Sequence, residues 1–115
     1  MDIHIINTAI TRTQLTEIAS ERFGDIVKAV VDIKRGVMAI GGEMHADEEI
    51  ELLAQGSVQD DLWGINLYPD KTDEGWIEFD SMINLRPSQG NRSRSVEDPT
   101  IRQTITHIVA SLITD

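Results

Sequence analysis

Apolar residues recur at intervals of three and four positions in three segments of the chain, as they do on the buried face of an amphipathic helix. The segments are residues 11–24, 45–56 and 97–113. Thr11 with Gln14 three positions later has the pattern of a capping box, and Asp98 followed by Pro99 is typical of a helix start. Acidic residues open the middle segment and Gly56 closes it, so all three segments are predicted helices.

The remaining apolar segments predict β-strands. They are residues 2–6, the two arms of a hairpin within 25–42, and the two arms of a second hairpin at 61–68 and 75–85. In the first hairpin, apolar positions alternate with charged ones such as Lys28 and Asp32, which predicts one buried face and one mostly wet face. Its return strand, residues 37–40, is apolar throughout and is expected to be central and covered on both sides. The arm 75–85 is predicted as one long strand.

The order of the predicted elements is β-α-β-β-α-β-β-α. Because a hairpin places consecutive strands side by side, two hairpins in sequence favour a mostly antiparallel sheet. The helices need a surface on which to bury their apolar faces, and the sheet supplies it. We therefore predict a single α+β domain over residues 1–115, with helices packed on a five-stranded sheet.

The composition is that of a globular protein. Hydrophobic residues make up 40% and charged residues 26% of the 115 residues, and no apolar run approaches the roughly 20 residues of a membrane span. The start of the chain contains an acid and lacks the basic region of a signal peptide. The absence of cysteine excludes disulfides and thiolate zinc sites. We expect a cytoplasmic protein with no membrane partner.

Charge is distributed unevenly along the chain. The formal net charge is −10; residues 1–80 hold 6 Lys or Arg against 17 Asp or Glu, whereas residues 81–115 hold 4 against 3. The phosphates of nucleic acid repel so acidic a protein, and we therefore expect no DNA partner. The arginines of the second part need a separate explanation.

Four stretches of the sequence resemble a small prokaryotic protein family of similar length. They are ERFGDIVKAVVDI, MAIGGEMHADEE, LWGINLYP and WIEFDSMINLRPSQGNRSRSVEDP, and the resemblance extends over nearly the whole chain from Thr11 onward. The family is a domain of unknown function. The resemblance therefore implies one complete domain, and it implies no particular reaction, cofactor or catalytic residue.

A loop between the second hairpin and the last helix gathers arginines around a glycine. Guanidinium groups match the oxygens of phosphate or carboxylate groups, and Gly90 permits a turn whose N–H groups converge on an anion. The predicted ligand-binding residues are Arg86, Ser88, Gln89, Asn91, Arg92 and Arg94. The expected partner is a small anionic ligand or an acidic protein. The alternative is that these arginines pair with the protein's own carboxylates.

A second cluster of polar residues follows the end of the first hairpin. Glu43 and His45 lie two positions apart in an extended segment, and with Asp47 they have the ligand types of a divalent metal site. A metal-dependent hydrolase acting on a phosphate-bearing substrate is therefore a second hypothesis, with His45, Glu43 and Asp80 as catalytic candidates. The alternative is that the acids at 47–49 only begin a helix and that the histidine is a hydrogen-bonding residue at a strand end.

The two polar features meet if the sheet face between them is open. Glu78, Asp80 and Asn84 share one face of the predicted long strand, and Asn66 and Tyr68 lie on its neighbour. Buried polar groups without partners cost about 1–3 kcal/mol each, so such a face needs water or a ligand, and a polar pocket follows. Three functions stay open, namely an anion-binding module, a metal-dependent hydrolase and a self-associating scaffold. A homodimer is compatible with all three.

Overall fold

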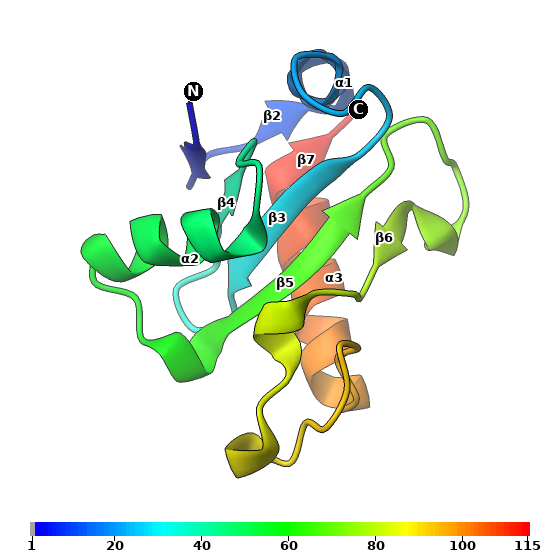
Figure 1. Ribbon diagram of the computed structural model, residues 1–115. Helices are drawn as coiled ribbons and strands as arrows, with labels where there is room; N and C mark the ends of the chain where they lie inside the picture. Colours follow the sequence, from blue (N-terminus) through cyan, green and yellow to red (C-terminus); the bar gives the residue numbers. More distant parts are fainter. Residues whose placement is uncertain (1) are drawn as a thin grey trace.

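A five-stranded antiparallel sheet forms the middle layer of the molecule, with helices on both of its faces (Figure 1). The computed structural model describes residues 2–115. The strands of this sheet are β1 (His4–Ile6), β3 (Val27–Asp32), β4 (Val37–Ile40), β5 (Leu62–Leu67) and β6 (Ile77–Glu78), in the order β1-β4-β3-β5-β6. The helices are α1 (Arg12–Ser20), α2 (His45–Ala54) and α3 (Pro99–Leu112). The predicted α+β fold with a five-stranded antiparallel sheet is confirmed.

The two faces of the sheet bury two apolar layers. α2 covers one face, where Leu52 packs against Val30 and Leu62. α1 and α3 cover the other face, where Leu15 and Val109 belong to a larger cluster. β4 lies between β1 and β3, and its residues are buried on both sides except at the first position. The prediction of a central strand from its unbroken apolar pattern is therefore confirmed.

The prediction of a mostly wet face on β3 is wrong, because α2 covers that face. Asp32 on this face is fully buried. Its carboxylate accepts hydrogen bonds from the backbone N–H groups of Lys34 and Arg35, at 2.9 Å each. It also accepts one from the Ser57 hydroxyl at 2.7 Å. The acid thereby holds the turn between β3 and β4 to the segment that follows α2.

Both helix starts that were predicted from capping residues are confirmed. The Thr11 hydroxyl accepts a hydrogen bond from the Gln14 N–H at 3.1 Å, and the Gln14 side chain accepts one from the Thr11 N–H at 2.8 Å. At α3, the Asp98 carboxylate accepts a hydrogen bond from the Thr100 N–H at 2.8 Å, with Pro99 at the first helical position. These bonds satisfy donors that the first turn of a helix otherwise leaves unpaired.

A second, two-stranded sheet joins regions near the two ends of the chain. β2 (Ile10–Thr11) directly precedes α1 and pairs in parallel with β7 (Ile113–Thr114), which directly follows α3. Each strand has only two residues, and a segment so short has no sequence period from which a strand could be predicted. Among residues 2–115, no helix has the length and apolar character needed to cross a bilayer.

The prediction of one long strand at 75–85 is wrong beyond its first part. β6 pairs with β5 over two residues only, and the chain then forms a short 3-10 turn at Met82–Asn84. Gly64 of β5 permits the close approach of this segment, because a Cβ at that position would lie 2.5 Å from the Cβ of Ser81. The chain therefore passes close over β5 instead of pairing along it.

Side chains complete the edge of β5 where β6 stops. The Asn84 amide accepts a hydrogen bond from the Gly64 N–H at 2.8 Å and donates one to the Gly64 carbonyl at 2.9 Å, as a neighbouring strand would. It also donates to the Arg94 carbonyl at 2.9 Å. Two residues earlier on β5, the Arg86 guanidinium donates to the Leu62 carbonyl. The segment after β6 thus belongs to the sheet edge through its side chains.

Candidate functional site

Arg86, the first arginine of the loop, is held by the protein itself. Besides its bond to Leu62, its guanidinium donates to the Ile83 carbonyl at 3.0 Å and lies 4.9 Å from the centre of the Trp63 ring. Glu49 of α2 forms an ion pair with it at 3.5 Å. These contacts fix the loop to α2 and β5 and occupy most of the donors of Arg86.

Asn91 organises the rest of the loop. It is buried, and its amide nitrogen donates to the carbonyls of Asn84 and Ser95 at 2.7 Å each. Ser88 and Gln89 lie exposed at the turn that precedes it. The Asn91 amide is therefore used to shape the loop from within.

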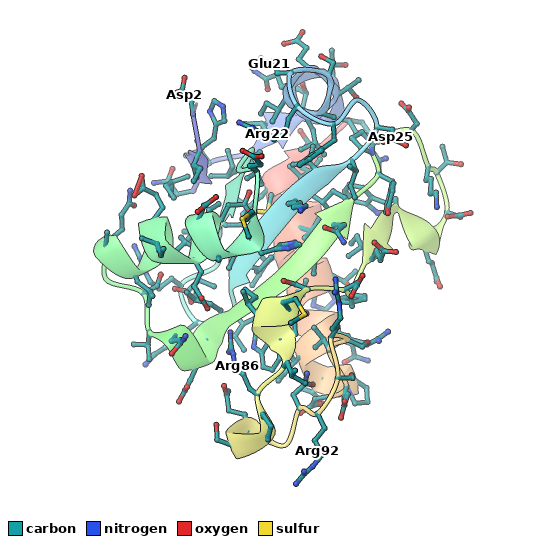
Figure 2. All side chains as sticks on the ribbon, viewed as in Figure 1. Asp2, Glu21, Arg22, Asp25, Arg86 and Arg92 are labelled. Atoms are coloured by element: carbon teal, nitrogen blue, oxygen red, sulfur yellow. The ribbon has the colours of Figure 1, made fainter. Side chains whose placement is uncertain are left out.

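The two remaining arginines of the loop point to different places. Arg92 projects away from the rest of the molecule at the tip of the loop (Figure 2), and its guanidinium forms no ion pair within the described chain. Arg94 forms an ion pair with Asp80, with 2.7 Å between Nε and Oδ1. The six residues predicted to bind an anion thus do not converge on one point, and two of the arginines pair with the protein's own acids.

A cleft of about 220 Å³ opens between the start of α2, the sheet and the turn at Met82–Asn84. We call it the α2 cleft. Its polar lining residues are Lys28, His45, Asn66, Asp80, Ser81 and Arg94. Its apolar lining residues are Ile26, Met44, Ala46, Met82 and Ile83. The predicted pocket is present in part, because His45, Asn66, Asp80 and Arg94 meet here. Most of its lining is apolar, and Glu78, Asn84 and Tyr68 do not line it.

The strand register places the charged groups near the cleft in a row. Lys28 of β3 is paired with Asn66 of β5, and Asn66 is paired with Glu78 of β6. Directly paired residues of antiparallel strands share one face of the sheet, so a cation, an amide and a carboxylate follow one another across three strands. The Asn66 amide nitrogen donates to the Glu78 carboxylate at 2.9 Å and to the Asp80 carbonyl at 3.1 Å. The side-chain charge thus changes from positive to negative across the sheet.

α2 begins at His45, and this places the imidazole ring over β5. Its Nε2 lies 2.8 Å from the Ile65 carbonyl, and because a carbonyl oxygen only accepts, Nε2 carries the hydrogen. Burial lowers the pKa of His45; the hydrogen bond to Ile65 opposes this shift, and the charge of Lys28 adds to it. At neutral pH the ring is therefore uncharged, and its Nδ1 is a hydrogen-bond acceptor.

Glu48 is a buried acid that the sequence pattern assigns to the solvated start of a helix. One of its oxygens accepts a hydrogen bond from the Gly42 N–H at 2.9 Å, and the other has no partner within the described chain. Burial raises the pKa of Glu48 to about 9, so the side chain is protonated and uncharged at neutral pH. A signal was present, because His45, Glu48 and Leu52 have the three- and four-residue spacing of one helix face.

The predicted metal ligands are not assembled. Glu43 is 68% exposed and pairs with Arg22 at 4.0 Å, whereas Asp47 is exposed on the first turn of α2. Within residues 2–115, no group of three His, Cys, Asp or Glu side chains is placed to hold a metal ion. The cause is local: α2 begins at His45, so the extended segment on which the prediction depended ends before the histidine.

A larger hollow of about 490 Å³ lies beside β6 and α3, and Trp76 and Phe79 belong to its lining. Both rings are already covered by arginines, since Arg12 lies 4.0 Å from the centre of the Trp76 ring and Arg102 lies 4.6 Å from that of Phe79. No described residue of this hollow has a buried polar atom without a partner, whereas Asn66 of the α2 cleft has one. The α2 cleft is therefore the stronger candidate.

The fold and the cleft define a small three-layer α+β domain with a cleft at a helix start. The chain belongs to the family described as a protein of unknown function (DUF5674), and the match covers residues 4–112. The predicted membership of a family of unknown function is confirmed. No curated protein and no solved structure matches the chain.

Proposed function

We propose that this domain binds a small anionic ligand in the α2 cleft. The proposal is carried by one observation. An uncapped helix start and a lysine without a carboxylate partner line the same cleft. Both groups favour negative charge at the same place, which supports an anion as the ligand.

The start of α2 is open to such a ligand. Met44 occupies the capping position and makes no side-chain hydrogen bond there. The backbone N–H groups of His45 and Ala46 have no acceptor within the described chain, and both residues line the cleft. The N-terminus of a helix carries partial positive charge as well as free N–H groups, and for both reasons it binds anions.

Lys28 adds a full positive charge to the same cleft. Its ammonium group forms no ion pair with a carboxylate of the described residues, and it lies 5.2 Å from the centre of the Phe23 ring. Burial raises the pKa of Glu48 to about 9 although Lys28 lowers it, so this neighbouring acid is uncharged at neutral pH. The charge of Lys28 is therefore available to a ligand.

The size of the cleft favours a small molecule over a macromolecular partner. Pockets for drug-sized ligands begin at about 300 Å³, and the α2 cleft measures about 220 Å³. The net charge of −10 repels polyanions and acidic protein surfaces at long range. A single small anion, in contrast, is held at short range by direct hydrogen bonds.

The test compares two lysine substitutions by isothermal titration calorimetry, with small carboxylates and inorganic phosphate as probes. We expect Lys28→Gln to weaken binding about tenfold or more, because a hydrogen bond to a charged group contributes about 1.5–3 kcal/mol. Lys34→Gln is the matched control, since it removes the same charge from an exposed position on the neighbouring turn. It should leave the affinity unchanged.

Arg92→Gln separates the cleft from the arginine loop. If the exposed loop arginine holds the anion, this substitution weakens binding while Lys28→Gln does not, and the α2 cleft is then the wrong site. If the wild-type protein binds none of the anions, the proposal fails as a whole.

A further inference from the structure

A buried acceptor that a plain anion cannot use lies at the α2 cleft. Asn66 lines the cleft and is only 6% exposed. Its nitrogen donates to two oxygens, one on Glu78 and one on Asp80, so the orientation of the amide is fixed and Oδ1 faces the other way. That oxygen accepts no hydrogen bond of standard geometry within the described chain, and the His45 ring is the neighbouring polar group of Asn66. An unpaired buried acceptor is unfavourable, so a ligand that brings a donor gains binding energy here.

Asp80 supplies a second acceptor beside the first. Its Oδ1 accepts from Arg94 at 2.7 Å, and its other carboxylate oxygen accepts no hydrogen bond within the described chain. The hydrogen bond between the Asn66 nitrogen and the Asp80 carbonyl, at 3.1 Å, keeps the two residues adjacent. A positively charged N–H group at this point meets the Asp80 carboxylate oxygen that Arg94 leaves free, with the Asn66 amide on the neighbouring strand.

Lys28 and Asp80 lie on different sides of the cleft, and Arg94 is on the Asp80 side. Lys28 is on β3, Asp80 follows β6, and Asn66 on β5 lies between them in the sheet. A ligand with its carboxylate toward Lys28 and an ammonium group toward Asp80 pairs the groups at both sides. An anion without the ammonium group leaves Asn66 Oδ1 unpaired.

Two exposed methionines line the same cleft. Met44 is 56% exposed and precedes α2, whereas Met82 is 62% exposed and begins the turn at the opposite wall. Methionine side chains adapt their shape to an aliphatic group. Among the described residues that line the cleft, none is Phe, Tyr or Trp, so a nucleobase or sugar ring finds no large aromatic surface on which to stack.

We propose that the ligand of the α2 cleft is a small zwitterion with an aliphatic body, of which an apolar α-amino acid is the simplest example. The inference rests on the proposed function, because it takes the anion site at Lys28 and the start of α2 as given. It adds an ammonium group held by Asn66 and Asp80, and an aliphatic chain held by Met44 and Met82.

The experiment uses the whole chain and three compounds that share one aliphatic body. L-Leucine carries both charges, isocaproate lacks the ammonium group, and isoamylamine lacks the carboxylate. Affinities are measured by NMR chemical-shift titration, which detects weak complexes. We expect L-leucine to bind about tenfold or more tightly than isocaproate, and isoamylamine to bind most weakly of the three.

Asp80→Asn tests the ammonium side of the cleft separately. The variant removes the negative charge, and its amide oxygen still accepts from Arg94, so the cleft should keep its shape. L-Leucine should bind about tenfold more weakly to the variant, whereas isocaproate should bind equally well or better. A loss of the same size for both ligands would instead indicate a general change of shape and overturn the assignment of Asp80.

The outcomes separate the two proposals. If isocaproate binds the wild-type protein as tightly as L-leucine, the zwitterion is overturned and the anion site stands. The same holds if neither compound binds while inorganic phosphate does. If isoamylamine binds tightly and no anion binds, both the anion site and the zwitterion are overturned.

Discussion

Glu48 is a residue whose chemistry departs far from that of its free side chain. It lies between α2 and the sheet, with the Gly42 N–H as its hydrogen-bond donor, and burial raises its pKa from 4.5 to about 9. An unfolded chain loses this proton near the lower value. Between the two values the folded protein holds one proton more than the unfolded chain, so the free energy of unfolding falls as pH rises, by at most about 1.4 kcal/mol per pH unit.

Glu48→Gln is therefore expected to flatten the pH dependence of stability. The contribution of Glu48 is fully present below pH 4.5 and is lost as pH rises through about 9. Glutamine keeps an acceptor for the Gly42 N–H and has no proton to lose. The free energy of unfolding of the variant should therefore increase, relative to that of wild type, as pH rises through this window. Urea unfolding at about pH 5, 7 and 9 measures the gap, with exposed Glu51→Gln as the control. Parallel profiles for wild type and Glu48→Gln would mean that Glu48 is ionised in the folded protein.

Four residues of the candidate site could be predicted from the sequence, and others could not. His45, Asn66, Asp80 and Arg94 belong to polar clusters or to the polar sheet face that the sequence pattern predicts, and all four line the cleft. The alternating sequence pattern places Lys28 on the predicted solvent-exposed face of a strand, where a lysine indicates no particular function. Its role depends on its cross-strand neighbour Asn66 and on the helix above it, and neither is specified by the local sequence.

Among the elements, the helices were predicted best because their end signals are local. Thr11 and Gln14 lie within one turn of the helix that they begin, so their spacing alone carries the information. The strand at 75–85 failed for the opposite reason. An alternating pattern looks the same whether the backbone pairs with its neighbour or leaves the sheet, and here Asn84 and Arg86 bond to the edge of β5 through their side chains.

Asn84→Ala tests whether that side-chain edge stabilises the fold. The substitution leaves both the N–H and the carbonyl of Gly64 without their partner. Unpaired buried groups cost about 1–3 kcal/mol each, so the free energy of unfolding should fall by about 3 kcal/mol or more. Urea unfolding measures the change. Gln89→Ala removes an amide from an exposed position of the same loop and should change stability by no more than about 0.5 kcal/mol. Equal effects of the two substitutions would show that the bonds to Gly64 are dispensable.

At the scale of the whole molecule, the excess of acids shapes both stability and ligand choice. The chain has 20 Asp or Glu against 10 Lys or Arg, so its folded form gathers charge of one sign. This repels an anionic ligand at long range and leaves a zwitterion, which has no net charge, free to approach. The positive groups of the α2 cleft then act only at short range.

Salt should therefore stabilise the folded protein. Raising NaCl from about 10 mM to about 150 mM shortens the screening length from about 30 Å to about 8 Å and weakens repulsion among the acids. The melting temperature, followed by the fluorescence of Trp63 and Trp76, should rise by a few degrees. A melting temperature that falls with salt would mean that attractive pairs, such as Arg86 with Glu49, outweigh the repulsion.

The side chains on the edge of β5 also govern how the sheet meets other copies of the chain. A strand edge with free N–H and carbonyl groups is a template onto which a foreign strand can add, and this is a common start of aggregation. The Asn84 side chain forms hydrogen bonds with the N–H and carbonyl groups of Gly64 on that edge, and the Arg86 side chain donates to the Leu62 carbonyl. The loop thereby blocks strand addition at this edge of the sheet, where β6 is too short to do so.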